Sequence, residues 1–532
     1  MERKPKDGVR KNTTNKSRGK YNNKRAIAPG EDKAVHKQSH NDASWYMSDT
    51  QLVNDVASVS FNTALGNPIT LTGSIGTTLS VNSTSVYLPG IMSIYTSPTI
   101  GVSTDANSPV NIAMRRLYAY VRHANSGHSN YDPADLMIYL LAMDSIYTYW
   151  AYMVRAYGVA QVFSRTNKYV GDALLTAMGV DPNIRENLAD FRAYINTFAA
   201  KAQQWCVPRV MTYFLRHNWM YSNVYKDEDN DKAQMYLYVP ASLYKYNATL
   251  SEGTAGGLEM RSINVEMDSS GYLQTKTLPN NYVDLIAMGN DLLNALAGQE
   301  DIGIISGDIL KAYGADNLWK IDTIPTDYQV IPVFSEEVLE QIHNTAFAGG
   351  NIVNANGDNV GVVGLDVTQD TSIGGGCLKF NPIFNRGTHM CLDTLMDTWK
   401  EQVSAETVMT ASRNMLSGKP FTPTPGKEVK ALVQATQLRS CGSEICLFGT
   451  VFTLNGNVMD RVRIYATSQY APNIYNMPRF NEAPIRPIMS SNGTECVGIF
   501  GEMTNYGILS KQNIDQIHEV ALMSLFGVPF LK

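Results

Sequence analysis

Apolar positions are densest between residues 133 and 157, where the sequence predicts one long helix. Asp132 is placed to cap its first turn, and Pro133 suits the first helical position, where no backbone N–H is needed. The stretch runs to Gly158 and is apolar on nearly every side, whereas a surface helix shows one polar face. We therefore expect this helix to be buried, either within the subunit or between subunits.

Shorter stretches with helical periodicity predict further helices. They span residues 169–178, 183–204, 213–219, 282–297, 306–313, 335–346 and about 392–414. A last helix is expected near the C-terminus, capped by Asn513 and stopped by Gly527 and Pro529. Its inward face would carry Ile514, Ile517, Ala521 and Leu525.

Other parts of the chain have the pattern of strands. Residues 41–110 are rich in Ser, Thr, Gly, Val and Ile with repeated turn residues, and residues 234–275 alternate. The interval from about 347 to 480 is rich in Gly, Asn, Thr and Val and holds the strand-like runs 444–453 and 461–466. The pattern predicts a mainly α fold with a β-rich insertion (α+β), and we find no internal repeat.

Composition adds that the subunit can bury a large core. Of its 532 residues, 44% are hydrophobic, 17% are charged and 29 are tyrosine. No apolar run reaches the roughly 18 residues of a membrane span, so we expect no stable membrane insertion. Few charges and many aromatic residues are typical of interface cores, which favours a subunit that packs against copies of itself. A large core within a monomer is the alternative.

Charge is distributed unevenly along the chain. Residues 1–40 hold 12 Lys+Arg and 4 Asp+Glu, whereas the remaining 492 residues hold 32 basic and 45 acidic side chains. With Tyr21 as its single aromatic residue, the segment 1–40 has too little apolar surface to offset the entropy of ordering, and we expect a disordered basic arm.

The basic side chains of the arm suit the phosphate backbone of a nucleic acid, bound without reading of base sequence. A solubility tail or a localisation signal would have a similar composition. The predicted RNA-binding residues are Arg3, Lys4, Lys6, Arg10, Lys11, Lys16, Arg18, Lys20, Lys24, Arg25, Lys33 and Lys37.

Cysteine usage predicts free thiols in a reducing compartment, because the cysteines are few and scattered and no secretory signal precedes them. They are Cys206, Cys377, Cys391, Cys441, Cys446 and Cys496. Cys441 and Cys446 form the closest pair, and their spacing is not that of a zinc or redox motif.

No enzyme motif is complete in this sequence. The chain lacks a phosphate-binding loop, a dinucleotide fingerprint and a nucleophile elbow. Asp227, Asp229 and Asp231 begin like an EF-hand loop, but Lys232 occupies the position that requires Gly. We therefore expect a solvated acidic loop, no cofactor and no resident metal.

His123, His128 and Asp132 are the remaining metal or catalytic candidates. They span a loop without helical spacing, and no fourth ligand is evident. Hydrogen-bonded loop histidines beside a helix cap are the simpler interpretation.

Several long strings closely resemble the capsid proteins of picobirnaviruses. The longest spans residues 115–158 and includes HSNYDPADLMIYLLAMDSIYTYW. Shorter strings are TNKY at 166–169, AMGV at 177–180, LRHNWMYSN at 215–223, AQMYLYVP at 233–240 and NDASWY at 41–46. The resemblance covers roughly residues 41–245 well and the C-terminal helix loosely, whereas residues 345 to 480 show little of it.

This resemblance implies a non-enzymatic capsid protein that forms two-fold dimers and an icosahedral shell around double-stranded RNA, with a helical shell domain and a protruding domain. It also implies a place in the virion capsid, assembled in the host cytoplasm; the sequence identifies no host receptor. We divide the chain into a basic RNA-facing arm (1–40), a shell domain (41–344), a protruding domain (345–480) and a C-terminal part of the shell (481–532). The limits of the protruding domain, residues 345 and 480, are inferred from composition.

Two other functions fit parts of the sequence. An RNA-coating nucleoprotein without a closed shell would use the same basic arm. An enzyme with an unfamiliar site would have to be built around His123, His128 and Asp132. We rank the nucleoprotein second and the enzyme last.

Overall fold

The computed structural model describes most of the chain beyond the basic arm. The described residues are 43–58, 63–67, 69–75, 79–86, 88–125, 127, 131–251, 255–269, 271–349, 351–385, 394–400, 402–421, 435–455, 458–464, 479–489 and 496–527. The chain forms two compact units, Met1–Asn62 and Thr63–Lys532. In the first unit, the described part is a short 3₁₀ helix η1 (Ala43–Tyr46) and helix α1 (Thr50–Ala57).

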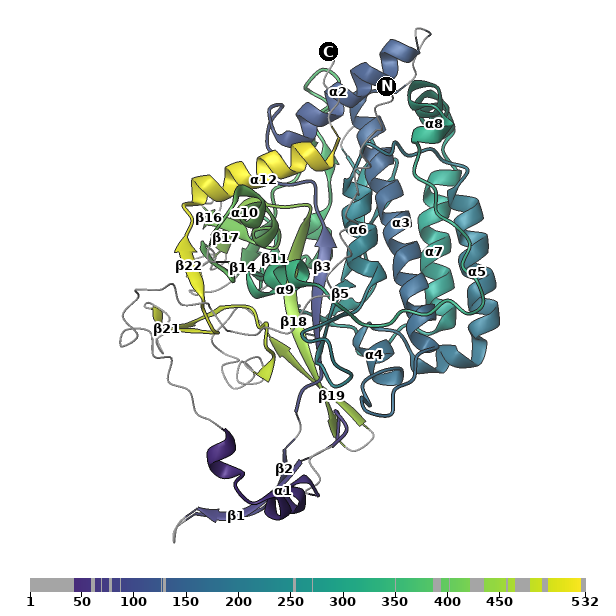
Figure 1. Cartoon of the computed structure of the whole chain (residues 1–532). Helices are drawn as coiled ribbons and strands as arrows, with labels where there is room; N and C mark the ends of the chain where they lie inside the picture. The colour runs from purple at the N-terminus through teal and green to yellow at the C-terminus, as the bar shows by residue number, and fades with distance from the viewer. Residues whose placement is uncertain are drawn as a thin grey trace, which may run out of the picture. The chain divides into compact units, whose positions relative to one another are not determined.

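A six-stranded mixed sheet lies at the centre of the second unit (Figure 1). Its strand order is β10 (Val333–Phe334), β4 (Tyr225–Lys226), β5 (Met235–Pro240), β3 (Ile91–Pro98), β18 (Glu444–Asn455) and β19 (Val458–Ile464). Strands β3 and β5 are parallel, and β18 is antiparallel to β3. All residues of β3 and β5 are buried, as expected for strands covered on both faces.

Helices pack beside this sheet around α3 (Pro133–Ala160), as Figure 1 shows. The helices in contact with α3 are α2 (Pro109–Ala124), α4 (Asp172–Ala177), α5 (Leu188–Ala202), α6 (Tyr213–Ser222), α7 (Tyr282–Ala297) and α8 (Glu300–Tyr313). Almost every residue of α3 is buried, and Trp150 is partly exposed. The helix that is apolar on all sides is therefore buried within the subunit.

Several small sheets complete the second unit. One has four strands in the order β11 (Asn351–Val353), β14 (Ile383–Asn385), β17 (Ala435–Cys441) and β16 (Leu416–Pro420). The two-stranded sheets pair β1 (Ile69–Ile75) with β2 (Leu79–Val86), β6 (Ser242–Asn247) with β7 (Gly257–Ser262), β8 (Val265–Met267) with β9 (Leu273–Thr275), β12 (Thr368–Gln369) with β13 (Leu378–Lys379), β15 (Leu395–Thr398) with β22 (Asn505–Ile508), and β20 (Arg486–Met489) with β21 (Cys496–Phe500). The helices of this part are α9 (Glu336–His343), α10 (Ala405–Ala411) and α12 (Lys511–Leu525). The α+β class is confirmed.

Most predicted helices are present with shifted ends. Helix α3 begins at Pro133 as expected but continues past Gly158 to Ala160. At Gly158 an added Cβ would lie 2.6 Å from Val330 Cγ2, so the glycine permits a close approach and does not end the helix. Helix α8 begins at Glu300, six residues before its predicted start.

Three predictions of local structure are wrong. The expected helix over 392–414 is strand β15 followed by the short helix α10. The C-terminal helix is capped by Ser510, whose Oγ accepts the Asn513 N–H at 3.0 Å. The buried residues of that helix are Ile514, His518, Ala521 and Leu522, so the predicted inward face is wrong at Ile517, whereas Leu525 is partly buried and packs against the core.

Helix α2 (Pro109–Ala124) was missed altogether. It follows Ser108 and buries Val110, Ala113, Met114, Leu117 and Val121. Among the described residues, no helix has the length and apolarity needed to cross a membrane.

Candidate functional site

The predicted RNA-binding side chains, from Arg3 to Lys37, all lie outside the described residues. Their charge is known from the sequence alone, which places 12 basic and 4 acidic side chains in residues 1–40. RNA contact by this arm stays a prediction.

The residues that directly follow the arm present apolar side chains to solvent. Trp45, Tyr46, Leu52 and Val56 have exposed fractions of 67%, 72%, 62% and 68%, and none of the residues of α1 is buried. Asp49 caps α1 by accepting the N–H groups of Gln51 at 2.9 Å and Leu52 at 3.3 Å. Leu52 and Val56 are one helical turn apart, so α1 has an apolar face that the described residues of its own unit leave uncovered.

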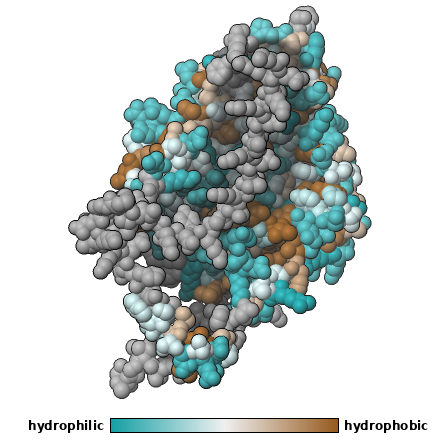
Figure 2. Space-filling model, viewed as in Figure 1, coloured by the Kyte–Doolittle hydropathy of each residue, from teal (hydrophilic) through white to brown (hydrophobic). Residues whose placement is uncertain are grey.

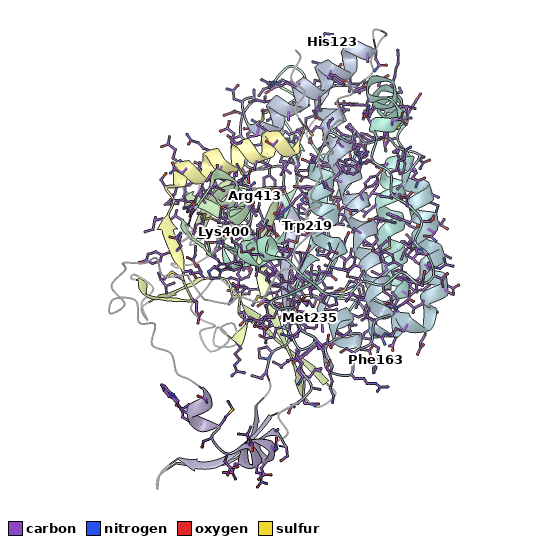
Figure 3. The ribbon with its side chains drawn as sticks, viewed as in Figure 1. His123, Phe163, Trp219, Met235, Lys400 and Arg413 are labelled. Carbon is purple, nitrogen blue, oxygen red and sulfur yellow. The ribbon has the colours of Figure 1, made fainter. Side chains whose placement is uncertain are left out.

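A second apolar surface lies on the larger unit, beside the first strand of its central sheet. The face seen in Figure 2 is mostly hydrophilic where atoms are coloured, with separate hydrophobic patches. Phe163 and Ile331 are 82% and 64% exposed, and Val333 and Phe334 of the edge strand β10 are 43% and 51% exposed. Phe163 and Ile331 line a hollow of about 690 Å³ whose wall includes Met235 of β5 (Figure 3).

The acidic loop, the first candidate metal site, is held by hydrogen bonds of its own. Asp227 is buried and accepts the Gln234 N–H at 3.1 Å and the Tyr236 hydroxyl at 3.2 Å, while Asp229 pairs with Lys226 at 2.9 Å. Asp227 therefore belongs to a turn. The prediction of a solvated acidic loop is wrong for Asp227, which is buried. Within the described residues, no group of three or more His, Cys, Asp or Glu side chains is placed to hold a metal ion.

The candidate site around His123 is described in part. His123 is exposed in the last turn of α2, as Figure 3 shows, and His128 lies outside the described residues. Asp132 is exposed, and its backbone N–H donates to Asp135 Oδ2 at 2.9 Å. The described geometry therefore supports the role of Asp132 as the N-cap of α3.

A buried ionic network that the sequence did not predict joins the helices to the sheet. His217 Nδ1 lies 2.6 Å from Asp144 Oδ2, and its Nε2 lies 3.2 Å from the Ser443 carbonyl oxygen and 3.8 Å from Glu444 Oε2. Arg216 Nη2 lies 2.5 Å from Glu444 Oε1. We call Asp144, Arg216, His217 and Glu444 the core ion network; it connects α3, α6 and the start of β18.

Charge balance explains how the core ion network is tolerated. Two carboxylates face one guanidinium and one imidazole, so a protonated His217 makes the group neutral. Both acids raise the pKa of His217, although its burial acts in the opposite direction. Burial raises the pKa of Asp144, whereas Arg216 and His217 hold the pKa of Glu444 below its usual range despite its burial.

This network has the residue types of a hydrolase triad but not its geometry. The Ser443 hydroxyl donates to Glu444 and not to His217. Asp144, His217 and Glu444 are buried, and the Arg216 side chain is 10% exposed. A nucleophile has to be oriented by its base and be reachable by substrate. We therefore assign the network a structural role.

Tyrosines supply much of the core of the subunit. Fully buried examples are Tyr139, Tyr149, Tyr152, Tyr169, Tyr213, Tyr221, Tyr225, Tyr236, Tyr238 and Tyr244. Many donate to backbone carbonyls, as Tyr149 does to Leu285 at 2.7 Å. The large number of tyrosines therefore reflects a hydrogen-bonded core, and it does not by itself indicate an interface between subunits.

The prediction that the cysteines are free is confirmed for the four thiols that the structure describes. Cys206, Cys377, Cys441 and Cys446 are free, and the last three are buried. Burial raises the pKa of Cys441 to about 12, which leaves that thiol protonated and unreactive.

Comparisons with known proteins agree with one another. A family model described as Picobirnavirus, Capsid protein matches residues 45–474. The capsid protein precursor of a human picobirnavirus (strain Human/Thailand/Hy005102/-) is 29% identical over 523 residues, covering 93% of this chain and 92% of the relative. A crystal structure of the picobirnavirus capsid superposes with a TM-score of 0.76 at 22% identity, covering 91% of this chain and 98% of that chain. The last comparison confirms the fold.

Proposed function

This chain belongs to the picobirnavirus capsid protein family, and on that premise we propose that it assembles through two-fold dimers into an icosahedral shell around double-stranded RNA. The observation that carries the proposal is the family match, which spans residues 45–474. As a capsid protein it is a structural component of the virion and associates with copies of itself. We further propose that it has no enzymatic activity and that it assembles in the host cytoplasm.

Exposed apolar surface supports self-association. Trp45, Tyr46, Leu52 and Val56 are exposed in the subunit, although aromatic and aliphatic side chains of this size are usually covered. Contact with another copy would remove them from water, at about 25 cal/mol for each Å² of apolar surface buried. We propose that residues 43–58 contribute to contacts between subunits.

We propose that the basic arm binds RNA through phosphate contacts. A flexible segment of 40 residues has a root-mean-square reach of roughly 35 Å, which is enough to extend from a shell surface into packed RNA. Each phosphate that a Lys or Arg neutralises releases counterions, so binding would weaken steeply as salt is raised. Residues 41–532 carry a net negative charge, which repels RNA. RNA would therefore bind to the basic arm and not to the rest of the subunit.

The division into shell and projection also stays a proposal. We assign residues 41–344 and 481–532 to the shell and residues 345–480 to the projection. Strand β18 (Glu444–Asn455) lies within that interval, but its residues 444–452 pair with β3. This pairing supports moving residues 444–455 from the projection to the shell.

Charge removal without shortening the chain tests the role of the arm. In the test variant, the twelve Lys and Arg residues of the arm are replaced by Gln; the matched control replaces the eleven Asn, Ser, Thr and Gly residues of the same arm by Gln. Particles are imaged by negative-stain microscopy, and nuclease-protected RNA is quantified. We expect closed particles from both variants and protected RNA from the control alone.

Other outcomes would redirect the proposal. Equal RNA protection by both variants would contradict RNA binding through the charge of the arm. RNA-dependent filaments, with no particles when RNA is absent, would favour the nucleoprotein that coats RNA without a closed shell.

A further inference from the structure

Strand β22 forms an open edge of the second compact unit. It pairs with β15 in a two-stranded sheet, which gives it one strand neighbour among the described residues. All four residues of β22 are exposed, whereas all four residues of β15 are buried. Figure 1 shows β22 near the left margin of this unit. The inner strand of the sheet is therefore covered, and the outer strand is not.

The register of this sheet indicates which backbone groups of β22 point away from β15. The Leu509 N–H donates to the Thr394 carbonyl at 2.9 Å, and this contact continues the register of the two strands. In an antiparallel pair, residues that exchange hydrogen bonds alternate with residues whose N–H and C=O point away from the partner strand. Gly507 therefore faces β15, whereas the N–H and C=O groups of Tyr506 and Ile508 point to the open edge.

The side chains along this edge are apolar and exposed to solvent. Tyr506 and Ile508 are 65% and 75% exposed, and as alternate residues of a strand they lie on the same face. On the other face, a Cβ added to Gly507 would have no atom within 4 Å. The strand therefore offers a second chain both outward backbone groups and uncovered apolar surface.

Another edge strand of the same unit is protected against pairing with other chains. Strand β16, at the edge of the four-stranded sheet, carries the exposed residues Lys419 and Pro420. Its register also shifts between Ser417 and Gly418. Charges, prolines and bulges of this kind keep edge strands from pairing with further strands. The four residues of β22, Asn-Tyr-Gly-Ile, include neither a charge nor a proline, so β22 lacks this protection.

Buried contacts fix the start of β22 in position. Asp397 of β15 is 0% exposed, and its carboxylate accepts the N–H groups of Thr504 at 3.0 Å and Asn505 at 2.7 Å. Asn344 holds Asp397 in turn through two hydrogen bonds of 2.8 Å to its backbone. A strand that is already ordered loses little conformational entropy when a second strand is added to it.

We propose that β22 pairs with β22 of a second copy of this chain, so that two β15–β22 sheets join into one four-stranded antiparallel sheet across a two-fold axis. The inference rests on the proposed assembly through two-fold dimers, and it names a surface that joins two copies. A two-fold axis perpendicular to a sheet makes neighbouring strands antiparallel. With the axis at Gly507, Tyr506 lies opposite Ile508 of the partner subunit, and the outward groups of both residues are hydrogen-bonded.

A second copy is the partner that this edge suits. The chain belongs to a family of capsid proteins, which pack against copies of themselves, and every copy brings the same strand. Because β22 carries no charge, its pairing with itself opposes no like charges. Two exposed side chains on a short strand offer far less than the roughly 1,200–2,000 Å² that a stable interface buries. We therefore expect the pairing to add to a larger contact in the particle and not to hold two free subunits together.

Disulfide cross-linking of the full chain in assembled particles tests the pairing. Gly507→Cys places a thiol on the two-fold axis, where facing residues have Cβ atoms about 4.5–5.5 Å apart, close to the separation that a disulfide needs. After mild oxidation, non-reducing gels should show about fivefold or more linked dimer than the unsubstituted chain, which reports the background from native cysteines. The matched control Gly303→Cys in α8, where an added Cβ also meets no atom within 4 Å, should stay at background.

A second pair of variants tests the pairing without a new thiol, and it decides the question if Gly507→Cys does not fold. Ile508→Pro removes an N–H that points to the open edge, a position where edge strands tolerate proline. Ile508→Val keeps that N–H. Particles of Ile508→Pro should dissociate at a lower urea concentration than particles of Ile508→Val, while the two unassembled subunits unfold at the same urea concentration.

Three results would contradict the pairing while leaving closed-shell assembly intact. They are particles of Gly507→Cys that link no more than background, equal linkage in Gly303→Cys, and equal dissociation of the Ile508→Pro and Ile508→Val particles. If the unsubstituted chain forms no particles, closed-shell assembly fails. Linkage of Gly507→Cys in the oligomers that do form then still supports the pairing, and its absence contradicts it.

Discussion

Helix α1 and helix α3 both carry large apolar side chains, but only α3 is covered by the described residues of its own compact unit. Leu141 of α3 is 0% exposed, whereas Leu52 of α1 is 62% exposed. Helix α3 is enclosed by other helices and by strands of the same unit, while α1 has no buried residue. The comparison teaches that apolar content alone does not distinguish a core from an interface. What distinguishes them is whether the compact unit that holds the helix also covers its apolar face.

Among the substitutions around α3, those in the core ion network are expected to lower the free energy of unfolding most. Glu444→Gln removes one of two buried carboxylates and leaves Arg216 and a protonated His217 facing only Asp144. Removal of one partner from a buried ion pair costs about 3–5 kcal/mol. We expect a loss of this size in the free energy of unfolding of the unassembled protein, measured by denaturant titration. Glu519→Gln on the exposed face of α12 should change it by less than about 0.5 kcal/mol.

The same substitution in the two helices compares them directly. Leu141→Ala should lower the free energy of unfolding by about 2–5 kcal/mol, because it leaves a cavity in a packed core. Leu52→Ala should change it by less than about 0.5 kcal/mol and should instead reduce particle yield. Denaturant titration and particle counts measure the two effects. A Leu52→Ala variant with lower stability and normal particle yield would contradict the distinction between the helices.

Gly158 tests how closely α3 is enclosed. A Cβ at this position would lie 2.6 Å from Val330 Cγ2 and 2.9 Å from the Val330 backbone nitrogen. Overpacking of this kind costs about 1–3 kcal/mol, and the backbone atom cannot rotate away. Gly158→Ala should therefore destabilise the subunit, although alanine favours helices. Gly303→Ala in α8, where nothing lies within 4 Å of the added Cβ, is the control and should not destabilise.

The smallest predicted effect is the change in the free energy of unfolding for each unit of pH. Asp144 and Glu444 raise the pKa of His217, so its proton stabilises the fold below the ordinary histidine pKa, and this contribution is lost as the pH rises through the raised pKa. One proton contributes at most about 1.4 kcal/mol for each pH unit. Unfolding free energies measured from pH 6 to 10 should fall less steeply in His217→Asn than in the unsubstituted chain. If the unfolding free energies of the variant and the unsubstituted chain fell equally with pH, the protonation of His217 would not contribute to stability.

Local signals in the sequence predicted the helices well where the caps and the periodicity agreed. Asp132 and Pro133 located the start of α3, and apolar spacing located α5 and α7. Helix α2 had a comparable signal, since Ser108 and Pro109 precede a regular apolar spacing, and it could have been found.

Long-range pairing explains the predictions that failed. Residues 395–398 form a strand because they pair with residues 505–508, about 110 positions later in the chain. Strand β18 is inserted beside β3, to which no local pattern connects it. The core ion network left one trace in the sequence, Asp144 in the middle of an apolar helix, and its partners came from α6 and β18.

The most direct test of the account is the assembly state of the purified, unsubstituted chain after removal of RNA. Sedimentation velocity and electron microscopy would be measured over a range of salt concentration and pH. We predict a dimer in equilibrium with closed particles of uniform size. A chain that stays monomeric under every condition, or that forms only filaments when RNA is added, would contradict assembly into a closed shell.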